Sequence, residues 1–306
     1  MLDYTRYPNL NELFSNTIST WPAHQKFLEK SIQSHSIQDM EKIEKLAGQI
    51  KGIIGRDLKS FINGYRWMCE AFIEEEIHFR RTGEYRCEDF STAHKNIYDH
   101  PHNMRHYMRG LLLSQVLWSA HTQSYLFFVD RFLPNLPDQY SILEVGFGHG
   151  LLLANAAKDP RCSTAEGWDL SLESLDHCKK TIRYFSVCHK VQLKLCDLFE
   201  PETDIKFDSI VLSELLEHLE DPARAVEKLK RVMHSKSMCY INIPVNSPAP
   251  DHITLWRSME EVVTFIQQCG YEVLDKKEVP ASGYTIEKAQ ALSASINCLL
   301  TVRLKT

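Results

Sequence analysis

A glycine-rich stretch near the middle of the chain constrains the fold most. Residues 141–150 read SILEVGFGHG. The apolar residues of its first half predict a short buried strand, which three alternating glycines bring to an end. We expect a helix over 151–158, because apolar residues continue there and Pro160 follows. A strand, a glycine turn and a helix in this order are typical of a nucleotide crevice, where backbone N–H groups face the ligand.

The spacing of the glycines distinguishes two kinds of nucleotide site. Gly146, Gly148 and Gly150 follow the pattern G-x-G-x-G, and Glu144 lies two positions before the first of them. A dinucleotide fingerprint has one more residue before its third glycine, which disfavours the alternative of an NAD(P)-dependent oxidoreductase. The stretch resembles motif I of the class I S-adenosylmethionine (SAM) methyltransferases. The resemblance implies that Glu144, the three glycines and Phe147 line a SAM site.

An acidic residue ends the second predicted strand, which covers 165–170. Asp169 lies 25 positions after Glu144. A carboxylate at this strand tip suits a ribose, because both ribose hydroxyls can donate to it. The sequence WDLS at 168–171 resembles the pattern that follows the second strand in the same family, and this implies that Asp169 and Leu170 contact the cofactor.

Two further strand ends carry candidate cofactor residues. Asp197 and Leu198 follow the third predicted strand, and the family resemblance implies that they hold the adenine. An aspartate that merely begins a loop is the alternative interpretation of Asp197. Ser213 and Glu214 follow the fourth predicted strand. Alternating strands and helices build a parallel sheet whose carboxyl ends share one edge, so we expect all these strand ends to line a single cleft.

The order of the elements predicts the fold class. We expect an α/β, Rossmann-like fold with a seven-stranded, mostly parallel sheet and helices on both faces. The last two strands, 271–279 and 297–304, are expected to form an antiparallel pair. Helical periodicity over the first third of the chain predicts an all-helical lid before the sheet. The predicted domains are therefore a helical lid over 1–100 and a methyltransferase domain over 101–306.

The C-terminal half carries a second resemblance. From Pro250 onward the pattern P…DH…W+S…E+V…GY+V looks like the ubiquinone-biosynthesis-type small-molecule methyltransferases. The whole resemblance covers about 136–303. It implies transfer of a methyl group from SAM to an oxygen or nitrogen of a small-molecule acceptor.

Candidates for acceptor contact lie in the helical segment before the first strand. The family resemblance implies that such helices cover the SAM sulfur, and the residues expected to face the pocket are Tyr107, Arg109, His121 and Tyr125. For each of them taken alone, packing or a place on the surface is the alternative.

Two histidines follow the fourth and fifth predicted strands and are candidate bases. His218 and His252 can each accept a proton near neutral pH. A sharper alternative adds two carboxylates, because Glu214, Glu217 and His218 read E-x-x-E-H. With His252 they resemble the metal cluster of the small-RNA 2′-O-methyltransferases, which would imply metal-assisted methylation of an RNA ribose. The same pattern is common in metal-free relatives, so our prediction contains no metal.

Composition bears on partners and compartment. The formal net charge of −5 argues against nucleic acid as the acceptor, because nucleic-acid binding relies on Lys and Arg. Nine cysteines without C-x-x-C spacing fit free thiols in a reducing compartment. A charged N-terminal stretch and short apolar runs predict a cytoplasmic protein without a membrane partner. A homodimer is left open.

Overall fold

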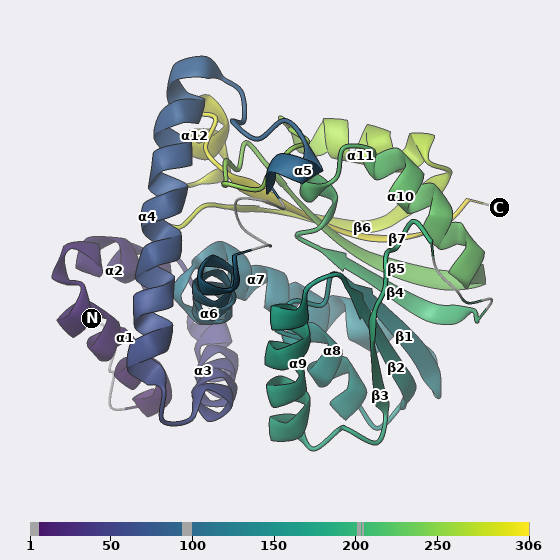
Figure 1. The fold of residues 1–306 in the computed structure, drawn as a ribbon, viewed down its shortest axis with the longest axis horizontal. Helices are drawn as coiled ribbons and strands as arrows, with labels where there is room; N and C mark the ends of the chain where they lie inside the picture. The colour runs from purple at the N-terminus through teal and green to yellow at the C-terminus, as the bar shows by residue number, and fades with distance from the viewer. Residues whose placement is uncertain (1–5, 94–99, 201–202, 204, 306) are drawn as a thin grey trace.

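The computed structural model describes residues 6–93, 100–200, 203 and 205–305. Its centre is one seven-stranded sheet with strand order β3-β2-β1-β4-β5-β7-β6 (Figure 1). The strands are β1 Tyr140–Val145, β2 Cys162–Asp169, β3 Val191–Leu195, β4 Phe207–Ser213, β5 Met233–Val245, β6 Tyr271–Pro280 and β7 Ile296–Leu304.

Strand directions agree with the sequence prediction. Strands β1 to β5 pair in parallel, and β7 is antiparallel to both β5 and β6. The predicted Rossmann-like sheet is therefore confirmed. Strand β5 begins at Met233, five residues before the predicted start of 238–243. Because the parallel strands share one direction, the loops after β1, β2, β3 and β4 emerge at the same edge of the sheet.

Helices cover both faces of the sheet. The helices that alternate with the strands or follow them are α8 Leu151–Lys158, α9 Leu172–Phe185, α10 Pro222–Leu229, α11 Met259–Gln268 and α12 Ile286–Ala291. Along β1, Ile142 packs in the apolar core that contains α8 and α9, whereas Leu143 packs in the core that contains α10 and α11. This alternation follows from the period of two in a strand and gives the sheet two buried faces.

Among the described residues, seven α-helices precede the sheet. They are α1 Pro8–Thr20, α2 Gln25–Gln33, α3 Met40–Ile54, α4 Leu58–Thr82, α5 Phe90–Ala93, α6 Pro101–Leu117 and α7 Ser119–Phe127. Gly55 and Gly83 end α3 and α4 with positive φ angles of 63° and 77°, as the sequence predicted. The helix expected from Pro101 onward divides at Trp118, whose backbone is extended. The predicted helix start at Asp99 lies outside the described residues.

The helical region shares a core with one face of the sheet. Leu10 and Met68 belong to the same buried apolar cluster as Ile142 and Tyr240 of the strands. The long helix α4 lies beside α6, over the edge of the sheet where the strand-end loops emerge (Figure 1). The division into 1–100 and 101–306 remains a prediction. Within the described part of the chain, none of the helices combines the length and apolar character that a bilayer crossing requires.

Candidate active site

A cavity of about 1110 Å³ lies between the strand ends and the helical region. Small-molecule sites in proteins reach about 1,000 Å³, so this cavity has room for a cofactor and an acceptor together. Loops after β1 to β4 form one part, which we name the strand-end half. Every predicted cofactor residue except Gly150 lines it: Glu144, Gly146, Phe147, Gly148, Asp169, Leu170, Asp197, Leu198, Ser213 and Glu214.

The glycine turn holds its shape through backbone geometry that side chains would oppose. Gly148 has a φ of 47°, and its N–H donates to Oδ2 of Asp169 over 3.0 Å. Gly150 has a φ of 70°, and a Cβ atom there would lie 2.2 Å from Sγ of Cys178 on α9. Gly150 therefore serves the close packing of the turn against α9, which explains why it does not line the cavity.

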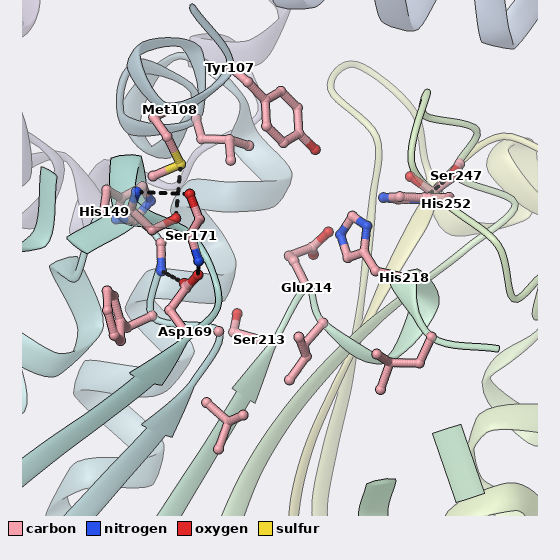
Figure 2. A pocket seen from close by; sticks show the side chains of 18 of the residues that line it. Tyr107, Met108, His149, Asp169, Ser171, Ser213, Glu214, His218, Ser247 and His252 are labelled. Atoms are coloured by element: carbon pink, nitrogen blue, oxygen red, sulfur yellow. Dashed lines mark hydrogen bonds between the residues drawn. The ribbon is translucent and has the colours of Figure 1, made fainter. Parts of the chain in front are cut away.

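Asp169 connects the glycine turn to the next helix. Its Oδ1 accepts the N–H of Ser171 over 2.8 Å, while Ser171 caps α9 by accepting the N–H of Ser174. Burial raises the pKa of Asp169 above its ordinary value. A carboxylate has about four acceptor positions, so Asp169 can still accept from ligand hydroxyls beside its two backbone donors. Figure 2 shows this carboxylate at the cavity wall.

The other acids of the strand-end half differ in their surroundings. Oε2 of Glu144 accepts the N–H of Leu153 over 2.8 Å, and burial raises the pKa of Glu144 to about 8. Asp197 is exposed and accepts the N–H of Phe199 over 2.9 Å. Two leucines, Leu170 and Leu198, place apolar surface in the same half, and Leu170 is 56% exposed. An exposed leucine within a cavity suits a planar, apolar ligand face.

Several residues that line the cavity near the glycine turn were not predicted, among them His149 and Met108. His149 lines the cavity inside the glycine turn, and burial lowers its pKa to about 3, so it is neutral at pH 7. Met108 of α6 reaches over the turn, and its Sδ accepts from the Ser174 hydroxyl over 3.7 Å. Both are labelled in Figure 2. The sequence offered no signal for Met108, because an apolar residue at helical spacing has the same pattern whether it faces a core or a cavity.

The rest of the cavity, which we name the helical half, is lined mainly by apolar and aromatic side chains. Many of them come from α4, α6, α7 and the residue between the last two helices, and others come from α2, α5 and the loop after β6. The residues that carry the argument are Phe72, Met104, Tyr107, Leu111, Trp118 and His121. Such a lining suits an acceptor with a substantial apolar or aromatic surface.

The four predicted acceptor residues separate into two pairs. Tyr107 and His121 line the cavity, but Arg109 and Tyr125 do not. Arg109 forms an ion pair with Asp57 over 3.2 Å. The hydroxyl of Tyr125 is buried and hydrogen-bonds to side chains of α3 and α8. Within the described chain, these contacts give Arg109 and Tyr125 structural roles at some distance from the lining.

Tyr107 and His121 are held by polar partners. The Tyr107 hydroxyl donates to Oδ1 of Asp251 over 3.3 Å, and burial raises its pKa well above 10. Nδ1 of His121 lies 2.8 Å from the Ser114 hydroxyl, and burial lowers the His121 pKa to about 4. Both side chains are therefore neutral at pH 7.

His218 and His252 meet at the cavity wall, as the sequence predicted from their strand ends. Their ring centroids are 4.7 Å apart and the rings are nearly perpendicular. Nδ1 of His218 lies 3.0 Å from the carbonyl oxygen of Asp251, and Nδ1 of His252 lies 2.6 Å from that of Ser247. A carbonyl only accepts, so each Nδ1 carries a proton, and Nε2 has a lone pair whenever the ring is neutral. Figure 2 shows the His218 ring beside Glu214 and the His252 ring beside Ser247.

Two glutamates lie beside the histidines. Oε1 of Glu214 accepts two amide donors, Nδ2 of Asn242 at 2.7 Å and Nδ2 of Asn297 at 2.6 Å. Glu217 is completely buried, and neither of its carboxylate oxygens has a hydrogen-bond partner among the described residues. Burial raises the pKa of both glutamates, and the nearby Glu214 charge raises that of Glu217 further.

Comparison with known families identifies the central segment. Residues 143–241 match the sequence model of a family described as a methyltransferase domain. This central segment is similar to a methyltransferase domain. This domain begins in β1 and ends in β5, so it includes the glycine turn, Asp169, Asp197 and the segment from Ser213 to His218. Such a domain implies SAM as the methyl donor, and methyl transfer is the activity it supports.

Solved structures show the same fold. A candidate sarcosine dimethylglycine methyltransferase from Galdieria sulphuraria has a TM-score of 0.51 and 11% identity over 61% of this chain and 87% of its own. A SAM-dependent methyltransferase from Aquifex aeolicus has a TM-score of 0.46 and 17% identity over 70% and 99% of the two chains. One from Geobacter sulfurreducens, in complex with S-adenosyl-L-homocysteine, has a TM-score of 0.47 and 14% identity over 60% and 91%. A comparison with curated protein sequences found no match.

Proposed function

We propose that this methyltransferase transfers a methyl group from SAM to an oxygen or nitrogen of a small acceptor with a largely apolar surface. One observation carries the proposal. The candidate cofactor residues at the ends of four strands line the same cavity as the aromatic side chains of the helical half, which come from α4, α6 and α7. The C-terminal resemblance to ubiquinone-type enzymes supports a small-molecule acceptor, as does the formal net charge of −5, which disfavours RNA.

The strand-end half fits the parts of SAM. Asp169 accepts the ribose hydroxyls, as its free acceptor positions allow. Leu170 and Leu198 cover the adenine faces, and Asp197 accepts from the adenine amino group. The turn of Gly146 to Gly150 leaves space for the methionine part, because a glycine backbone admits close approach.

The histidine pair lies where the acceptor's nucleophile would be activated. When bound, SAM supplies a methyl group on a positively charged sulfur, ready for displacement. The protein then has to align the nucleophile with that methyl group, and alignment alone contributes several kcal/mol to lowering the barrier. A hydroxyl must also lose its proton, and the Nε2 lone pairs of His218 and His252 lie at the cavity wall, where they can assist this loss.

Turnover with a panel of acceptors tests the proposal. The purified chain is incubated with SAM labelled in the methyl group and with phenols, aliphatic alcohols, aromatic amines and a small RNA. We expect label transfer to an apolar phenol or amine, and none to the RNA. Transfer to RNA alone, or binding of SAM product without transfer to any acceptor of the panel, would overturn the proposal.

A further inference from the structure

The carboxylate of Glu217 is buried in surroundings that disfavour its negative charge. Its carboxylate is completely buried, and neither oxygen has a hydrogen-bond partner within the described residues. Buried polar groups in proteins are nearly always paired, because an unpaired one costs the free energy of its lost hydration. The Glu214 carboxyl beside it can share a hydrogen bond with it only when one of the two is protonated, so this buried pair of acids favours either a shared proton or a bound cation.

The backbone around Glu217 brings the two histidines together. The carbonyl oxygen of Glu217 accepts the N–H groups of Ile253 and Thr254 over 2.8 and 2.9 Å. This pair of hydrogen bonds fastens the loop after β5 to the turn after β4. As a result, His252 and His218 both lie close to the Glu217 carboxylate, although 34 residues separate the two histidines in the sequence.

The backbone hydrogen bonds of the two histidines hold their rings in the orientation that metal ligands require. Each Nδ1 donates to a backbone carbonyl, which leaves each Nε2 with a lone pair for a further partner. Histidines that bind metal ions almost always donate their other ring N–H to a carbonyl or carboxylate in this way. The His252 ring is also packed edge-on against Tyr85, whose hydroxyl accepts the N–H of Ser247, so its orientation is held from outside.

The distances match a shared ion and exceed a direct hydrogen bond. One ligand atom from each of Glu217, His218 and His252 lies within 4.8 Å of the other two. Nε2 of His218 is 3.9 Å from Oε1 of Glu217. Ligands on one ion, each about 2 Å from it, lie roughly 3–4 Å apart. The cluster therefore needs only a small contraction to hold an ion.

We propose that Glu217, His218 and His252 bind a divalent transition-metal ion at the wall of the cavity. Two imidazoles and one carboxylate suit Zn²⁺, Co²⁺ or Mn²⁺ better than Mg²⁺ or Ca²⁺, which prefer oxygen ligands. Both histidines line the cavity, so the remaining coordination positions face the acceptor. The role of the ion rests on the proposed function: it would occupy the Nε2 lone pairs of both histidines, and it would replace the free histidines as the group that favours loss of the acceptor's proton.

Glu214 lies outside this set of three ligands. Oε1 of Glu214 already accepts from Asn242 and Asn297, so its position is fixed without an ion. The four-residue metal alternative from the sequence thus narrows to three ligands. Since Glu214 lines the cavity next to them, we expect it to contact the acceptor instead.

Cobalt titration of the chelator-treated protein tests the site independently of turnover. Co²⁺ bound to imidazole and carboxylate gives a visible absorption band, and we expect saturation at one equivalent per chain. Glu217→Gln keeps the shape of the side chain but removes the charge, and it should weaken Co²⁺ binding at least about thirtyfold. The control is His189→Asn, which removes an exposed histidine far along the chain from the cluster and should leave the titration unchanged.

Binding of S-adenosylhomocysteine (SAH) to each variant distinguishes failure of the metal site from failure of the proposed function. Unchanged SAH affinity in Glu217→Gln shows that this variant folds. Absence of stoichiometric Co²⁺ binding in the parent protein, or equal binding by Glu217→Gln, overturns the metal site while the proposed function stands. Failure of the parent protein to bind SAH would overturn the proposed function and leave the metal result unaffected.

Discussion

The strand-end half of the cavity is shaped by loop backbone, whereas the helical half is shaped by side chains from long helices. In the first half, Gly148 and Asp169 are joined by a hydrogen bond whose geometry depends on a positive φ angle. In the second, Trp118 and Leu111 contribute surface without any special backbone. A backbone with positive φ angles requires particular residue types at particular spacings. An apolar surface on a helix can be built from many different residues. The comparison shows why the strand-end half can be predicted from residue types and spacing, whereas the helical half cannot.

The largest expected effect is the loss of turnover on replacement of His218, whose ring lies at the cavity wall. Replacing His218 by Asn removes the Nε2 lone pair while keeping a hydrogen-bonding side chain. We expect turnover at saturating SAM to fall by at least about a hundredfold, which is the range for groups that assist proton transfer. SAH affinity, measured by calorimetry, should stay within about twofold. A variant that loses SAH binding together with turnover would place His218 in the strand-end half.

The next effect isolates the strand-end half. Asp169→Ala removes the acceptor of the Gly148 N–H and the proposed ribose contact. Each hydrogen bond to a charged group contributes about 1.5–3 kcal/mol, so SAH affinity should fall by about a hundredfold in calorimetry. Asp176→Ala on the exposed side of α9 is the matched control and should change nothing. Equal affinities of the two variants would contradict the role of Asp169.

A smaller effect appears in the pH dependence of stability in the helical half. Burial lowers the pKa of His121 to about 4, below its ordinary 6.5. The unfolded chain therefore binds a proton that the folded chain refuses, so His121 lowers stability as the pH falls from 6.5 to 4. Denaturant unfolding of His121→Gln should show a decline smaller by about 2 kcal/mol over this range. Identical slopes for the two proteins would mean that His121 is not buried in solution.

The smallest expected effect concerns the helical half of the cavity alone. Leu111→Trp adds volume on the wall of the helical half, so the acceptor should bind about tenfold more weakly, by analogy with the cost of overpacking. The KM for the acceptor should rise in steady-state assays, whereas SAH affinity should not change. A rise in the KM for SAM of the same size would show that the two halves are not separate.

The sequence predicted the strand-end half because physical constraints there leave marks in residue types. Gly150 must be glycine since its Cβ would meet Cys178, and Asp169 must be acidic at the strand tip. The seven-stranded sheet could be predicted for the same reason, from strand and helix periodicity with turn residues between them. The SAH titrations and turnover assays described above test the proposed ligand contacts.

The helical half could not be resolved from sequence because packing and lining give the same pattern. Trp118 and Trp256 are both aromatic residues that could line a cavity or pack in a core, and in the structure Trp118 lines the cavity whereas Trp256 is buried against Phe265. In the same way, Tyr107 lines the cavity, whereas Tyr125 is buried and hydrogen-bonds to side chains of α3 and α8. Which face of a helix meets a cavity depends on how neighbouring helices pack, and residues distant in sequence determine that.

Calorimetric titration of the purified chain with SAH and, separately, with NAD tests the central claim most directly. The account predicts saturable SAH binding with one site per chain and no detectable NAD binding at the same concentration. Saturable NAD binding, or no heat of binding with SAH at millimolar concentration, would contradict it.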